Sequence, residues 1–169
     1  MTQIIGFDPT SVKTSAQGAE FRVGTKAGYT DKDAADGEKE YIYVTAAEAI
    51  TAAGYLCVID SAFSAEMLDT TSSAPGAGAG RPVGAAMAAI ASGGYGWLQI
   101  YGEGSARTLA SAALGTELTS SATPGAVDDA TTAGLEVING LSLGTATGGS
   151  EATNADAFFN YPIVGRTLA

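Results

Sequence analysis

The side chains that could perform covalent or acid–base chemistry are few and scattered in this chain. The sequence contains no histidine, which is the residue most used for proton transfer near neutral pH and the commonest metal ligand. The only cysteine, Cys57, lies in an apolar run over residues 55–59. We expect a buried thiol there, because no histidine can activate it as a nucleophile. A single cysteine also excludes an internal disulfide and a cysteine-based zinc cluster.

Carboxylates are the remaining candidates for catalysis, since two of them with separated pKa values can drive hydrolysis. The acidic residues beside apolar or turn-forming segments are Glu48, Asp60, Glu66, Glu103 and Glu117. No spacing among them singles out a pair. A serine–lysine pair has no support either, because the lysines are confined to the N-terminal region. We therefore predict that the protein is not an enzyme and has no catalytic residues; a small enzyme with an unusual carboxylate site is the alternative.

Two loop-like motifs invite a ligand. Asp31, Asp33, Asp36 and Gly37 resemble part of a calcium loop, but their spacing departs from that of the EF-hand. We interpret residues 31–38 as a solvated acidic loop, with a weak calcium site as the alternative. The glycine-rich segment 69–80 lacks the Gly-Lys-Ser/Thr ending of a phosphate-binding loop. The sequence therefore predicts no cofactor and no metal.

The chain is acidic, with 18 acidic and 8 basic residues and a net charge of −10. That charge argues against binding to nucleic acid and against docking on an anionic membrane, both of which recruit lysine and arginine. It favours solubility at high concentration and would suit a basic partner surface. No stretch approaches the roughly 20 apolar residues of a membrane span, and the first residues lack the pattern of a signal peptide. We expect the protein to stay in the compartment where it is made until it assembles.

The composition is typical of a mainly β protein. Hydrophobic residues make up 46% of the chain, alanine dominates them, and glycine, serine and threonine fill much of the rest. Strands are predicted over residues 40–45, 55–60, 63–68, 81–91, 95–102, 105–110, 114–118, 135–146 and 157–164, with period-two alternation clearest over 40–45. A turn over residues 102–104 separates two of them. A helix over residues 84–91 is the alternative on propensity alone. One short helix is expected over residues 45–54, with Thr45 as its N-cap and Glu48 closing a capping box.

The first 40 residues differ from the β-rich body that we predict over residues 41–169. They carry five of the eight basic residues, an acidic cluster and few apolar side chains. Residues 19–25 alternate like one short edge strand. The rest is predicted to be an extended N-terminal arm, whose apolar side chains Ile4, Ile5 and Phe7 could reach a neighbouring subunit.

The order of several segments after residue 40 resembles that of the head decoration, or cement, proteins of tailed bacteriophages. The segments are Ala-Glu-Ala-Ile-Thr-Ala-Ala-Gly-Tyr at 47–55, Arg-Pro-Val-Gly-Ala-Ala at 81–86, Gly-Tyr-Gly-Trp-Leu-Gln-Ile-Tyr-Gly at 94–102, Leu-Gly-Thr-Glu-Leu at 114–118 and Phe-Asn-Tyr-Pro-Ile-Val-Gly at 159–165. This resemblance covers about three quarters of the chain. It implies a small β-barrel or tulip-like sandwich that assembles on the outer face of a capsid.

The resemblance also implies a function: a structural virion protein, made in the host cytoplasm, that binds the outer capsid surface. Such proteins stabilise the head by bridging major capsid subunits, so the implied partners are the major capsid protein and further copies of this chain, as a trimer. Another virion component, such as a capsid spike or fibre-base domain, is the first alternative, and a bacterial surface or adhesion module is the second.

The residues predicted to contact a partner are apolar pegs of the arm and aromatic side chains of the strands, which anchor interfaces when they are exposed. They are Ile4, Ile5, Phe7, Phe21, Trp97 and Tyr101. A position in the hydrophobic core is the other interpretation of Trp97.

Overall fold

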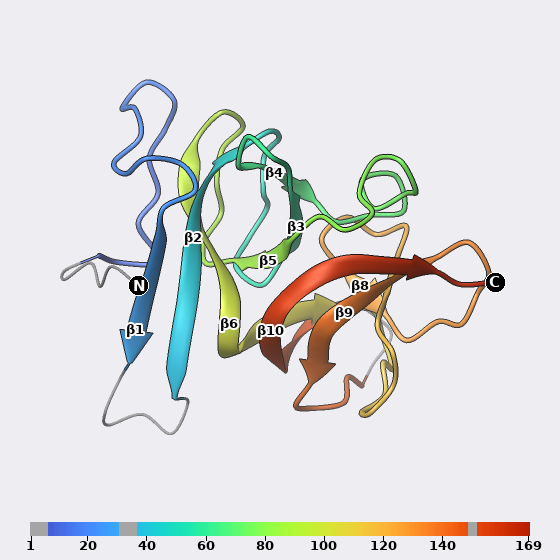
Figure 1. Ribbon diagram of the computed structural model, residues 1–169. Coiled ribbons are helices and arrows are strands. Elements are labelled where there is room, and N and C mark those ends of the chain that lie inside the picture. The colour runs from blue at the N-terminus through green and yellow to red at the C-terminus, as the bar shows by residue number, and fades with distance from the viewer. Residues whose placement is uncertain (1–6, 31–36, 149–151) are drawn as a thin grey trace.

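The computed structural model describes residues 7–30, 37–148 and 152–169, which form ten β-strands of one sheet (Figure 1). The strands are β1 (Lys26–Thr30), β2 (Glu38–Ala46), β3 (Leu56–Ile59), β4 (Ser64–Met67), β5 (Val83–Ala86), β6 (Tyr95–Thr108), β7 (Thr119–Ser120), β8 (Val127–Asp128), β9 (Glu136–Leu143) and β10 (Thr153–Thr167). No helix occurs in these three ranges. The prediction of a mainly β protein is confirmed.

The sheet curls back on itself through the long strand β6. The strand order is β1-β2-β4-β3-β5-β6-β10-β9-β7-β8, and β2 also pairs with β6. This extra pairing closes β2, β4, β3, β5 and β6 into a small ring. On the other side of β6, the short β8 pairs with it at Thr108, so that β10, β9, β7 and β8 curve around a second core. Two barrel-like halves therefore share β6, in agreement with the predicted small β-barrel.

Each half encloses its own apolar core. The first core contains Ile42, Leu98 and Ile100, which are side chains that β2 and β6 turn into the ring. The second core is built around Phe159 of β10 and Ile138 of β9. Side chains of a strand alternate between its two faces, so the residues next to these must point out of the ring.

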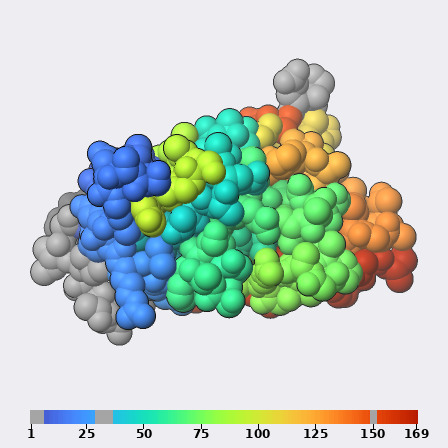
Figure 2. All heavy atoms as spheres, turned by 90° about the horizontal axis from the view of Figure 1, so that it is seen from above, coloured from blue at the N-terminus to red at the C-terminus, as the bar shows by residue number. Residues whose placement is uncertain are grey.

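The outer face of β2 and β6 is covered by residues 7–25. Lys13 and Tyr95 exchange two backbone hydrogen bonds, of 2.9 and 2.8 Å, which tie this segment to the start of β6. In Figure 2 the blue N-terminal residues lie against the yellow-green chain near residue 90. From residue 7 onward, the N-terminal region is therefore packed on the body, and β2 and β6 are buried on both faces over much of their length.

The predicted helix over residues 45–54 is wrong. Ile50 and Ile90 instead form an isolated β-bridge, with backbone N···O distances of 2.8 and 3.0 Å, and both side chains are buried in the first core. Glu48, expected in a capping box, accepts a hydrogen bond from the backbone N–H of Met67. Burial of Ile50 opposite Ile90 therefore overrides the local helix propensity.

Three other boundaries differ from the expectation. Residues 19–25 form a bend and a turn, with Gly24 of the turn at a φ of +85°, and the edge strand begins only at Lys26. The turn predicted over residues 102–104 is an irregularity within the continuous β6. There Gly102 has a φ of +91°, and a Cβ on it would collide with the carbonyl oxygen of Glu38. Residues 114–118 form a loop rather than a strand.

Candidate functional site

Three of the predicted partner-binding residues meet on the outer face of β2 and β6. The ring centroid of Trp97 lies 4.9 Å from that of Phe7 and 5.3 Å from that of Phe21. Trp97 itself is 1% exposed, and its indole Nε1 donates no hydrogen bond. Trp97 thus lies in the core of the isolated chain, where a partner could reach only the two half-buried phenylalanines that cover it. Ile4 and Ile5 lie outside the described residues.

Tyr101 belongs to a different aromatic cluster, on the surface where β6 meets β10. Its ring stacks on Tyr161 with centroids 5.1 Å apart and meets Phe158 edge-on at 5.8 Å. Phe158 and Tyr161 are 40% and 44% exposed. Their neighbour Ile163 is 40% exposed. The predicted set is therefore divided between a covered cluster and an exposed one.

Tyr161 is held in an unusual backbone conformation, with a φ of +48° in the left-handed region. Its hydroxyl donates a hydrogen bond to the buried Glu40, and the ammonium group of Lys26 lies 5.7 Å from the centre of its ring. Partial burial of Tyr161, followed by the bond to Glu40, raises its pKa to about 12. The exposed ring is therefore fixed in place by its polar tip.

The edge of the sheet at β1 is a second candidate site. β1 pairs with β2 on one side, and no other strand of the described chain pairs with it. The N–H of Tyr43 donates to the carbonyl of Thr25, at 2.9 Å. Since the bonds of an antiparallel pair alternate, the backbone groups of residues 26, 28 and 30 point away from β2. This edge can accept a strand from another chain.

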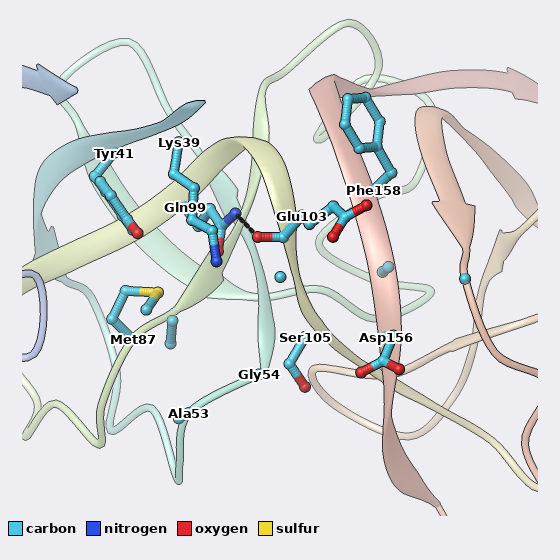
Figure 3. A pocket seen from close by; sticks show the side chains of 14 residues that line it. Lys39, Tyr41, Ala53, Gly54, Met87, Gln99, Glu103, Ser105, Asp156 and Phe158 are labelled. Atoms are coloured by element: carbon cyan, nitrogen blue, oxygen red, sulfur yellow. Dashed lines mark hydrogen bonds between the residues drawn. The ribbon is translucent and has the colours of Figure 1, made fainter. Parts of the chain in front are cut away.

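A cavity of about 610 Å³ lies between the two halves (Figure 3). Its lining includes Tyr41, Met87, Gln99, Glu103 and Asp156. The Nε2 group of the buried Gln99 donates to the carbonyl oxygens of residues 101, 102 and 103, at 3.1, 3.3 and 2.8 Å. The amide thus holds the backbone around the Gly102 irregularity, and we assign it a structural role. The carboxylates of Glu103 and Asp156 also line this cavity.

Reactive groups and metal ligands do not gather elsewhere in the described ranges. Cys57 is fully buried, and that burial, with a smaller contribution from Glu48, raises the pKa of its thiol far above the usual range. No group of three or more Cys, Asp or Glu side chains there could hold a metal ion. Most of the acidic loop over residues 31–38 falls outside those ranges, so the calcium alternative stays a prediction. No helix long and apolar enough to cross a membrane was found among the described residues.

Comparison of the chain with protein-family models, with curated proteins and with solved structures gave no significant match. The functional interpretation therefore depends on the residues and their geometry, and on the resemblance in segment order.

Sequence reasoning missed the partners of Tyr101. Phe158 and Phe159 are adjacent in a strand, so one of them had to face outward; the structure buries Phe159 and exposes Phe158. This alternation along the strand was the only feature of the sequence that could have indicated an exposed aromatic side chain next to Tyr101. Nothing in the local sequence could indicate the left-handed backbone of Tyr161, which depends on the residues packed around it.

Proposed function

We propose that this protein is a structural virion component that binds the outer capsid surface of a tailed bacteriophage and stabilises the head by bridging major capsid subunits. The observation that carries the proposal is the unpaired edge of β1. An extended segment of a capsid subunit can add to this edge as a further strand, through the outward backbone groups of residues 26, 28 and 30. Backbone pairing of this kind needs no catalytic group.

The body behind this edge is suited to a mechanical role. β6 runs through both barrel-like halves and pairs with β2 on one side and β10 on the other, so a load applied at β1 is transmitted through the sheet. The net charge of −10 complements a basic capsid surface. In this proposal Ile4 and Ile5 add apolar contacts to the capsid, next to the anchored Phe7.

Self-association forms the second half of the proposal. Copies joined as a trimer would present several edges at once, and contacts that are weak singly then combine into tight attachment. The protein would be made in the host cytoplasm and would reach the outer capsid surface by binding to the assembled head.

The test uses heads assembled without this protein, to which the purified chain is added. Cosedimentation and cryo-electron microscopy should place the wild-type chain on the outer face, and the decorated heads should survive heating better than bare ones. Gly28→Pro removes one outward N–H and should weaken binding at least about tenfold, because the added strand loses a backbone bond. The matched control is Gly148→Pro, in an exposed loop between β9 and β10.

Deletion of residues 1–6 separates the apolar contacts from the edge contact, because it spares Phe7 and its packing on Trp97. We expect a folded chain with reduced occupancy of the heads. Heads that bind no wild-type protein would overturn the proposed function. Full binding by Gly28→Pro would overturn the edge contact.

A further inference from the structure

An apolar groove of about 230 Å³ opens between β1 and β10. Its floor is formed by Ile42, Ile59 and Ile100, which belong to the core of the first ring. Lys26 is the only charged side chain among the described residues that line it. The groove thus exposes part of the apolar core, with one positive charge beside it.

Three of the exposed large apolar side chains of the described chain form the rim of this groove: Phe63, Tyr161 and Ile163. Phe63 and Tyr161 have φ values of +60° and +48°, which are unfavourable for bulky residues. The ring of Phe63 lies against Gly24, so closely that a Cβ there would be 2.5 Å from a ring carbon. Strained backbone kept at two positions of one groove is typical of a binding site.

Leu114 is the most exposed large apolar side chain of the described residues, at 53%. It lies in the loop between β6 and β7 and does not line the groove. The backbone of this loop is fixed on both sides of Leu114. The N–H of Ala112 donates to Thr147 Oγ1 at 2.9 Å, that of Ala113 donates to Asp129 Oδ2 at 3.0 Å, and Thr116 Oγ1 donates to the carbonyl of Ala113 at 2.9 Å.

The backbone of this loop is also strained. Apart from glycine, three described residues have a positive φ: Phe63 and Tyr161 on the groove rim, and Ser111, at +65°, at the base of the Leu114 loop. An exposed leucine on a rigid loop loses little conformational entropy when it binds, which is the property of an interface anchor.

Acidic side chains flank the loop, and one positive charge, Lys26, lines the groove. Asp129 accepts a hydrogen bond from the residue before Leu114, and Glu117 lies three residues after it, paired with Arg166 at 2.7 Å. The acidic neighbour Asp128 adds to this surface, whereas the groove lining carries only Lys26. Glu40, which accepts the hydrogen bond of Tyr161, lies on the other side of the rim, so the favourable charge contact is confined to Lys26 and the carboxylates of Asp128 and Asp129.

We propose that the groove binds Leu114 of a second copy of this chain. The groove exceeds the roughly 150 Å³ that accommodates benzene in an apolar cavity, so a leucine side chain fits. The contact joins two different surfaces head to tail, and contacts of this class close into rings such as trimers when the rotation allows. The inference rests on the self-association within the proposed function, and its test uses the purified chain alone, so its failure leaves capsid binding untouched.

Sedimentation over a concentration series tests the contact with three matched variants: Leu114→Lys, Ile163→Lys and Val12→Lys. Leu114→Lys removes the apolar side chain that would enter the groove and brings another positive charge close to Lys26. Ile163→Lys places a charged side chain on the rim of the groove. Each should weaken self-association at least about tenfold. Val12 is 41% exposed and lies outside both surfaces, so its variant should associate as the wild type does. Leu114→Ser replaces Leu114→Lys if the latter fails to fold.

Mixing distinguishes a head-to-tail contact from a symmetric one. Leu114→Lys keeps its groove and Ile163→Lys keeps its leucine, so the two variants should form a 1:1 dimer that grows no further. A wild type that stays monomeric, unaltered association of the Leu114 variants, or no dimer in the mixture overturns the proposal. Loss of association on deleting residues 1–6, with Leu114→Lys unaffected, would assign the groove to the N-terminal segment instead.

Discussion

The ring of Phe7 lies over the indole of Trp97, with centroids 4.9 Å apart, and also meets Tyr41 edge-on at 5.7 Å. Phe21 contacts the same indole from a second position, at 5.3 Å. The segment before β1 thus completes a hydrophobic cluster on the outer face of β2 and β6. The packing of Phe7 and Phe21 on Trp97 therefore contributes to the free energy of unfolding of the sheet.

Replacing Phe7 by alanine should therefore destabilise the body. The half-buried ring loses its aromatic contacts and leaves part of Trp97 open to water, at a cost of about 1–3 kcal/mol. Urea unfolding followed by tryptophan fluorescence measures both effects, because Trp97 is the only tryptophan. We expect a lower midpoint and red-shifted emission in the folded state. Leu114→Ala, at an exposed loop position, should leave both unchanged, whereas an unshifted emission in Phe7→Ala would show that Phe7 does not cover the indole.

Gly24→Ala connects backbone strain to the groove. Alanine at a φ of +85° costs about 1–2 kcal/mol, and its Cβ would displace the ring of Phe63 from the groove rim. Gly18→Ala is the matched control, because its φ is +75° but nothing lies within 4 Å of a Cβ there. Both variants should unfold at lower urea concentration than the wild type, and only Gly24→Ala should also weaken self-association. Equal self-association of the two variants would contradict the role of Phe63.

Local patterns were sufficient to predict the strands whose burial alternates or is continuous, such as β2, β3 and residues 157–164 of β10. They failed where a distant partner decides the conformation. Residues 45–54 have helix propensity, but Ile50 is paired with Ile90. Gly102 follows a turn-like pattern, yet it accommodates the carbonyl of Glu38 within a continuous strand.

The sequence could predict which types of residue would form the candidate sites, but not which of these residues would be exposed. Aromatic side chains were expected at partner contacts, but Trp97 is buried because a segment far from it in the sequence folds over its strand. The groove could not be anticipated at all, since Ile42, Ile59 and Ile163 come together only when β10 crosses the end of the first ring. Such a surface is a product of topology, and no local window of sequence contains it.

The hydrogen bond from Tyr161 to Glu40 predicts a loss of stability at alkaline pH. Partial burial and this bond raise the pKa of Tyr161 from 10.0 to about 12, so the folded state holds the proton more tightly than the unfolded state. The contribution is therefore complete below pH 10 and is lost as the pH rises from 10 to about 12. Urea midpoints measured across this range should fall more steeply for the wild type than for Tyr161→Phe.

Ultraviolet titration gives an independent measurement of the same group. Burial also raises the pKa of Tyr43, so Tyr161→Phe still contains a tyrosine that ionises at high pH. The absorbance change at high pH should nevertheless be smaller in Tyr161→Phe than in the wild type. Parallel pH profiles of stability in the wild type and Tyr161→Phe would exclude a stabilising bond to Glu40.

The thiol of Cys57 should be unreactive in the folded protein. It is fully buried, and burial, followed by the charge of Glu48, raises its pKa well above the usual range, so both access and thiolate formation are blocked. At pH 8, labelling by iodoacetamide should require unfolding and be at least about a thousandfold slower than in denaturant, for a stability of about 5 kcal/mol. Ser61→Cys adds an exposed thiol as a positive control and should incorporate one label rapidly. Rapid labelling of the wild type would mean that the first core opens without global unfolding.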